Sequence, residues 1–109
     1  MRLVLALFTL TMSAAGAAQA QTAQELLDRY KCASCHADTE AKAGPAFVDV
    51  AARYAGNPQA VAIVSGFLRN GAHGGGPWHM PPHPEISGSD AHTMARYILS
   101  RASSDPKRN

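Results

Sequence analysis

The chain has 109 residues, of which 46% are hydrophobic and 17% charged, with two cysteines and a formal net charge of +2. A balance so close to neutral argues against a nucleic-acid-binding protein, which normally presents a strongly basic face. A chain of this length forms one small domain, and such domains bury limited apolar surface and gain stability from a cofactor or a covalent staple.

The first twenty residues have the pattern of a secretory signal peptide. Arg2 supplies a positive start, residues 3–12 form an apolar run, and residues 18–20 read Ala-Gln-Ala, a small-x-small cleavage site. The apolar run is too short to span a bilayer. We therefore expect cleavage after Ala20, a periplasmic mature domain of residues 21–109, and no stable membrane insertion.

The first helix of the mature chain is predicted over residues 23–33. Thr22 and Glu25 have the spacing of a capping box, in which each side chain binds the backbone N–H of the other residue. The stripe of apolar side chains on this helix consists of Leu26, Leu27 and Tyr30.

The motif Cys32-Ala33-Ser34-Cys35-His36 lies at the end of that helix. C-x-x-C-H is the attachment signature of a c-type haem, in which Cys32 and Cys35 form thioethers to one porphyrin and His36 binds the iron. A thioredoxin-like pair, half a zinc site and a structural disulfide are the alternatives. No predicted strand precedes the motif, the chain has no second cysteine pair, and a disulfide leaves His36 unexplained. We expect one covalent haem c with its iron.

Three more helices are predicted, over residues 46–55, 58–70 and 87–102, because apolar residues recur there at helical spacing. Gly56 and Gly71 are expected to end the first two of these helices. Residues 38–43 have no strong period and are expected to form a loop that ends at Gly44-Pro45. We expect Asn57 and Ser87 to cap the second and third of these helices. The tail, residues 103–109, is expected to fray. No convincing strand is found, so the predicted fold class is all-α.

Residues 72–84 contain too many glycines and prolines for a regular helix or strand. A loop of this length in a small domain is usually functional or disordered. We predict that it supplies Met80 as the distal iron ligand, since Pro81 and Pro82 restrict the backbone that holds the sulfur. Met94, which falls on the apolar face of the last helix, is expected to be core.

Two histidines of the same loop, His79 and His83, are rival ligands, and the alternative for both is a solvated side chain. The choice matters, because a thioether favours reduced iron in an electron carrier. An open position favours ligand binding or peroxide chemistry.

With these features in place, the chain resembles the class I monohaem cytochromes c of the short bacterial type, over about residues 25–100. The shared features are the C-x-x-C-H motif, Gly44-Pro45, residues 50–56, Arg69-Asn70-Gly71, Met80-Pro81-Pro82 and the helix with Tyr97 and Ile98. The resemblance implies a small cytochrome c fold of four to five helices wrapped around one covalently attached haem. It also implies that the first helix crosses the last, with Leu27 meeting Tyr97.

The resemblance also implies roles around the haem. The carbonyl of Pro45 would accept a hydrogen bond from His36 and so orient the imidazole. Trp78 is one candidate haem contact, although the tryptophan of the family loop would fall on Gly75. Apart from the resemblance, Arg53 and Arg69 are candidates for propionate neutralisation, with solvated arginines as the alternative. The chain also departs from the family at His83, where an asparagine is common. We expect His83 near the Met80 sulfur or a propionate, where its charge would shift the midpoint potential.

The function expected from these features is one-electron transfer in the periplasm, without enzymatic activity, between larger redox proteins that dock through a small transient patch. A monomer is expected, with no nucleic-acid partner. Two alternatives stay open. One is a gas-binding or catalytic haem protein in which Met80 is displaced, and the other is the cytochrome subunit of an oxidoreductase complex.

Overall fold

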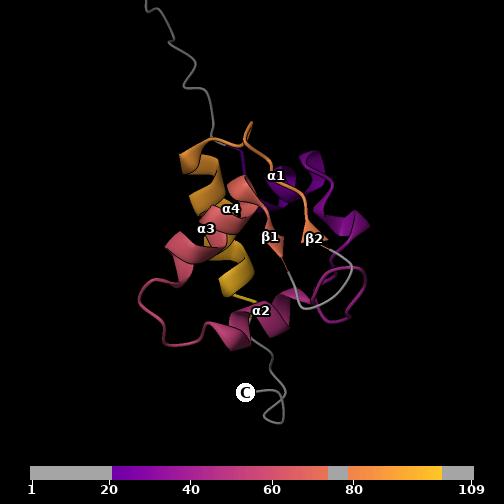
Figure 1. Ribbon diagram of the computed structural model, residues 1–109, viewed down its shortest axis with the longest axis vertical. Coiled ribbons are helices and arrows are strands. Elements are labelled where there is room, and N and C mark those ends of the chain that lie inside the picture. Colours follow the sequence, from indigo (N-terminus) through magenta and orange to yellow (C-terminus); the bar gives the residue numbers. More distant parts are fainter. Residues whose placement is uncertain (1–20, 74–78, 102–109) are drawn as a thin grey trace, which may run out of the picture.

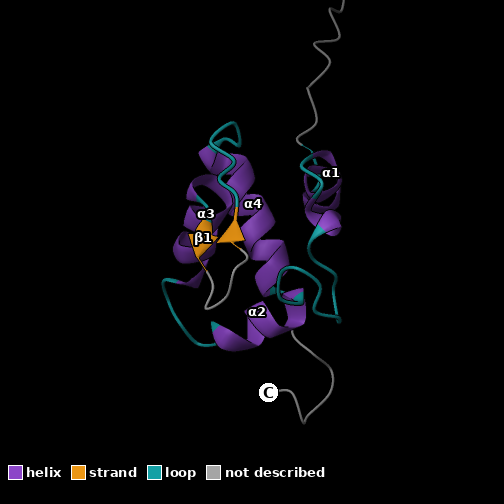
Figure 2. Cartoon of the chain, turned by 45° about the vertical axis from the view of Figure 1, so that its right-hand side comes forward, coloured by secondary structure: helices purple, strands orange, loops and turns teal. Residues whose placement is uncertain are grey.

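The computed structural model describes residues 21–73 and 79–101, and within them four α-helices pack around one core (Figure 1). The predicted signal peptide, Trp78 and the tail 103–109 lie outside the described residues. The helices are α1 (Ala23–Arg29), α2 (Phe47–Arg53), α3 (Ala60–Asn70) and α4 (Gly88–Leu99), joined by a 3-10 turn η1 (Cys32–Ser34) and two strands, β1 (Ala72–His73) and β2 (His79–Met80). The all-α prediction is confirmed, because helices form most of the regular structure in the described chain (Figure 2).

Helix α1 begins at the predicted capping box. The Thr22 hydroxyl accepts the backbone N–H of Glu25 at 3.2 Å, and the Glu25 carboxylate accepts the backbone N–H of Thr22 at 3.3 Å. The helix ends at Arg29 rather than at the predicted residue 33, because Lys31 adopts left-handed backbone angles of φ 56° and ψ 36°. That conformation ends the i to i−4 bonding of an α-helix, and the following turn starts in a new direction.

Helix α2 is shorter than the predicted range 46–55 at both ends, and α3 is shorter than the predicted range 58–70 at its start. Gly56 has a φ of 75°, as expected for a residue that stops a helix in the left-handed region. The expected Asn57 cap is wrong, because helix α3 begins at Ala60 and its N-cap residue is Gln59. The Asn57 side chain instead accepts the backbone N–H of Gln59 at 2.8 Å and holds a turn ahead of the helix.

Helix α4 packs against α1, α2 and α3 and carries the centre of the core. Ser87 caps it by accepting the backbone N–H of Asp90 at 3.0 Å, and Met94 is fully buried, so the core role predicted for this methionine is confirmed. None of the helices in the described part of the chain is long and apolar enough to cross a membrane. The core consists of Leu26, Leu27, Phe47, Val64, Leu68, Ile86, Ala91, Met94, Ala95 and Ile98.

The prediction that residues 72–84 contain no strand is wrong. Strands β1 and β2 form an antiparallel pair in which Ala72 lies opposite Met80 and His73 opposite His79. A two-residue pair is too short to leave an alternating pattern in the sequence. Gly71, with a φ of 80°, turns the chain out of α3 into β1.

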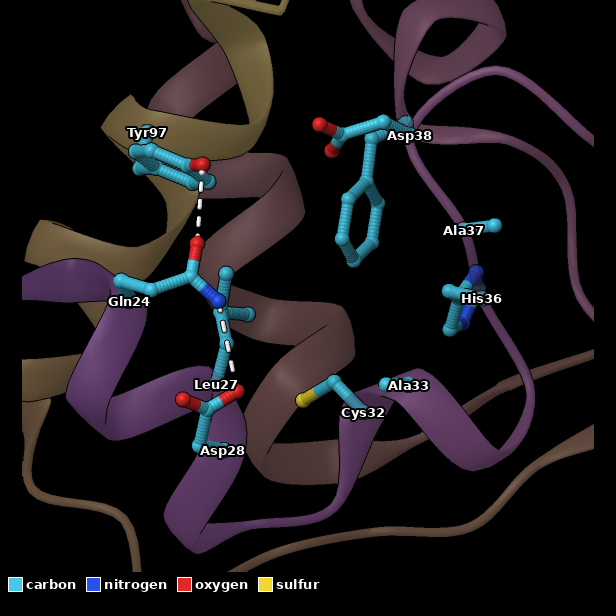
Figure 3. Close-up of a pocket in the computed structure, with 10 residues that line it drawn as sticks. Gln24, Leu27, Asp28, Cys32, Ala33, His36, Ala37, Asp38 and Tyr97 are labelled. Carbon is cyan, nitrogen blue, oxygen red and sulfur yellow. Dashed lines mark hydrogen bonds between the residues drawn. The ribbon is translucent and has the colours of Figure 1, made fainter.

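Helices α1 and α4 are linked by a hydrogen bond from the Tyr97 hydroxyl to the Gln24 side-chain oxygen, 3.0 Å long, and Leu27 lines the same cavity as these two residues (Figure 3). We expect Tyr97→Phe to lower the free energy of unfolding by about 0.5–1.5 kcal/mol, the usual net value of one hydrogen bond. Denaturant unfolding of Tyr97→Phe, of Gln24→Ala and of the double variant measures the coupling free energy between the two side chains. Fully additive effects would contradict a bond between these two side chains.

Candidate functional site

The C-x-x-C-H motif forms a single tight turn with both thiols free. The backbone N–H groups of Cys35 and His36 both bond the carbonyl of Cys32, at 3.2 and 3.0 Å. Cys32 is half-buried and Cys35 exposed, and neither is in a disulfide. Burial is the main cause that raises the pKa of the Cys32 thiol. The hydrogen bonds to the Cys32 carbonyl place both cysteines in one turn of chain, the arrangement that attachment to a single group needs.

The His36 ring is held in one orientation by a hydrogen bond and a ring contact. Its Nδ1 lies 2.7 Å from the carbonyl oxygen of Pro45, which can only accept a hydrogen bond, so Nδ1 carries the proton and the lone pair is on Nε2. The ring also stacks on Phe47 with ring centres 5.3 Å apart and planes 18° apart. An imidazole fixed in this way presents Nε2 as a ready metal ligand.

Gly44 allows the loop after the motif to close against the His36 ring. A Cβ atom at this position would lie 2.3 Å from His36 Cε1, well inside contact distance. The loop is closed by bonds from the Gly44 N–H to the Cys35 carbonyl at 2.7 Å and from Lys42 Nζ to the Ala33 carbonyl at 2.8 Å. From the sequence, Gly44 is expected at the end of a loop and as part of the Gly44-Pro45 pair shared with the family. A glycine next to the proline was the one available sign of this close approach.

An ion pair that the sequence did not predict links the residues just after α4 to this loop. The guanidinium of Arg101 binds the carboxylate of Asp38, two residues after His36. The partners are 63 residues apart in the chain, so no local pattern could have paired them.

The three candidates for the distal ligand lie in different surroundings. Met80 is half-buried and packs against the hydrophobic core. His79 is exposed and faces His73 across the strand pair, while His83 Nδ1 lies 3.0 Å from a carboxylate oxygen of Glu85. The bond to His83 lowers the pKa of the Glu85 carboxyl. That His83 tunes the midpoint potential stays a prediction. The observed neighbours of its ring are the Glu85 carboxylate and the ring of Tyr30, whose centre lies 6.2 Å away.

The two arginines proposed for haem propionates also differ. Arg53 is exposed at the end of α2, whereas the Nε of Arg69 donates to the Ile86 carbonyl at 3.1 Å. One of the five donors of Arg69 is therefore already bound inside the protein. Trp78, the third proposed contact, lies outside the described residues.

A set of apolar side chains packs on the core yet stays partly exposed, as expected where a large apolar group completes the core. Together with two cysteines in one turn, an imidazole oriented by the Pro45 carbonyl and a half-buried thioether sulfur, this set fits a haem held at two points. This combination defines a c-type haem protein. The partly exposed apolar residues are Tyr30, Cys32, Val50, Tyr54, Val61, Met80, Tyr97 and Leu99.

Comparison with known proteins agrees with this assignment. The family model for cytochrome c matches residues 14–102. The chain is 38% identical to cytochrome c-551 of Pseudomonas aeruginosa, over 87% of this chain and 90% of that protein. It is 36% identical to cytochrome c-552 of Hydrogenobacter thermophilus, over 84% and 94% of the two chains. The crystal structure of wild-type cytochrome c552 from Nitrosomonas europaea superposes with a TM-score of 0.67 at 33% identity, covering 71% of this chain and 96% of that one.

The chain belongs to the cytochrome c family. Its relatives of the short class I type confirm the resemblance drawn from the motifs, and its cofactor is one covalent haem c with iron. It is a small c-type cytochrome that carries electrons.

Proposed function

We propose that this cytochrome is a periplasmic one-electron carrier with His36 and Met80 as axial ligands of the iron and Cys32 and Cys35 as its thioether attachments. The observation that carries the proposal is the His36 ring, held by Pro45 and Phe47 with Nε2 free to bind metal. The bound haem supplies the one-electron ferric–ferrous couple.

Contacts within the chain hold the residues that bind the iron in fixed positions. Pro45 orients His36, Gly44 and Lys42 close the loop around it, and the ion pair of Asp38 with Arg101 anchors the same loop to α4. A thioether from Met80 favours the reduced state, and a ligand pair that is the same in both states leaves little to rearrange. These contacts support electron transfer rather than reaction at an open iron.

The surroundings of the candidate ligands favour Met80 over the two histidines. Met80 is packed against the core, whereas His79 faces His73 and His83 bonds Glu85. A second iron ligand must be held where water is excluded, and Met80 meets that condition better than an exposed or paired imidazole. Trp78, Arg53 and Arg69 remain proposed haem or propionate contacts.

We further propose that the partners are larger redox proteins, which dock through a small transient surface as a monomeric carrier requires. Export rests on the signal-peptide pattern of residues 1–20. A subunit of a larger oxidoreductase would carry the same site, and co-purification from periplasm under mild conditions distinguishes a free carrier from a subunit.

Mass and absorption spectra of the protein expressed with the haem-attachment machinery test the proposal. We expect residues 21–109 plus the mass of one haem, a low-spin ferric spectrum with the weak near-red band of sulfur on iron, and no spectral change of the ferrous protein with carbon monoxide. A colourless protein with the mass of the bare polypeptide would refute haem attachment. A coloured, high-spin protein that binds carbon monoxide would refute Met80 ligation and support a gas-binding haem protein instead.

A further inference from the structure

Two histidines outside the proposed iron ligands face each other on the strand pair. His73 in β1 lies directly opposite His79 in β2, and the strands lie side by side in Figure 1. The two ring centres are 5.4 Å apart, with an angle of 31° between the ring planes. Both side chains are exposed, so their ring nitrogens are accessible from solvent.

This spacing suits two imidazoles that share one metal ion. With metal–nitrogen bonds of about 2.0–2.1 Å in tetrahedral geometry, two imidazoles on one ion have ring centres roughly 5 Å apart. The observed distance of 5.4 Å between the ring centres is close to that value. Directly opposite residues of an antiparallel pair are also held in register by the backbone, so little order has to be created on binding.

We propose that His73 and His79 form a two-histidine site for a divalent transition-metal cation of the Zn²⁺, Cu²⁺ or Ni²⁺ class. Imidazole nitrogen is a preferred ligand for these ions and a poor one for Mg²⁺ or Ca²⁺. No group of three or more His, Cys, Asp or Glu side chains able to hold a metal occurs among residues 21–73 and 79–101. Water or a partner side chain therefore completes the coordination, and the ion exchanges readily.

The site couples to the haem if Met80 binds the iron, so this part of the inference rests on the proposed function. Met80 follows His79 in β2, and the backbone around Met80 is packed tightly against Gly71, where a Cβ would lie 2.7 Å from the Met80 carbonyl oxygen. A dication on the strand pair disfavours the additional positive charge of ferric iron, which raises the midpoint potential. By linkage, the ferrous protein binds the ion more tightly than the ferric protein does.

The test is calorimetric titration of Zn²⁺ into the tag-free ferric holoprotein. We expect one ion per chain, and removal of one of two ligands by His73→Ala or His79→Ala should weaken binding by about tenfold or more. His92→Ala is the matched control, because His92 is exposed on α4 and lies outside the pair, and its affinity for Zn²⁺ should equal that of the wild type. Unchanged affinity in His73→Ala would overturn the site, as would a loss in His92→Ala.

Two spectroscopic readouts separate this site from the iron ligation. In the diamagnetic ferrous protein, Zn²⁺ should shift the ring proton resonances of His73 and His79 together and leave those of His83 and His92 in place. The near-red ferric band should survive in His73→Ala. If that band is absent already in the wild type, the Met80 proposal fails while the zinc titration still decides the site.

Voltammetry tests the coupling. The midpoint potential should rise on saturation with Zn²⁺, should not rise with an equal concentration of Mg²⁺, and should not respond to Zn²⁺ in His73→Ala. A potential that is unaffected by Zn²⁺ in a wild-type protein shown to bind it would overturn the coupling.

Discussion

Replacing Met80 with alanine should remove the sulfur band from the ferric spectrum, open the iron to carbon monoxide in the ferrous state and lower the midpoint potential. Axial ligands set haem potentials over a span of about 0.8 V, so loss of the thioether is expected to cost on the order of a few tenths of a volt. The sign follows from the ligand, since a thioether favours ferrous iron over ferric iron more than water or an imidazole does.

Met94→Leu is the matched control for this experiment, because Met94 is the other methionine of the described chain and is fully buried in the core. A swap of similar volume should cost less than about 1.5 kcal/mol and leave the spectrum and the potential unchanged. If Met80→Ala kept the sulfur band, another residue would be the distal ligand. If instead the wild type lacked the band and His79→Ala changed the spectrum, the ligand would be that histidine.

Replacing Gly44 with alanine should disturb the His36 side of the haem site as strongly as Met80→Ala disturbs the side of the distal ligand. The new methyl group would lie 2.3 Å from His36 Cε1, so either the ring leaves the Pro45 carbonyl or the loop backbone moves. Overpacking of this kind typically costs about 1–3 kcal/mol, and here the strain falls on the group that binds the iron. We expect a lower free energy of unfolding for the holoprotein and a mixed-spin ferric spectrum.

Gly66→Ala is the control for that substitution. Gly66 lies within α3, and a Cβ there meets nothing within 4 Å, so alanine should be neutral or stabilising by about 0.5–1 kcal/mol. Denaturant unfolding and the ferric spectrum of both variants test whether the close approach at position 44 matters for the His36 ring. Equal stability of Gly44→Ala and Gly66→Ala, with identical spectra, would show that the His36 ring does not depend on the missing side chain at position 44.

Features that depend on a few consecutive residues could be predicted from the sequence. The capping box of Thr22 with Glu25, the Ser87 cap and the left-handed Gly56 each depend on atoms within three or four positions, so residue type and spacing suffice. The C-x-x-C-H motif is local for the same reason, since both cysteines and the histidine lie in one turn. The family match confirms the haem c predicted from it.

Features that depend on contacts between distant segments could be found only in the tertiary structure. Helix α1 ends early because Lys31 turns the chain toward the haem-attachment turn, although its composition favours continuing the helix. Asp38 meets Arg101 and Gln24 meets Tyr97 only because packing brings their elements together. His73 meets His79 through the pairing of two short strands, which are too short to leave an alternating pattern in the sequence. Helix caps and periodic stripes arise from interactions within one turn of chain, so they leave a pattern in the sequence. A pair formed across the core leaves none, because any of several charged or aromatic residues has the same local surroundings.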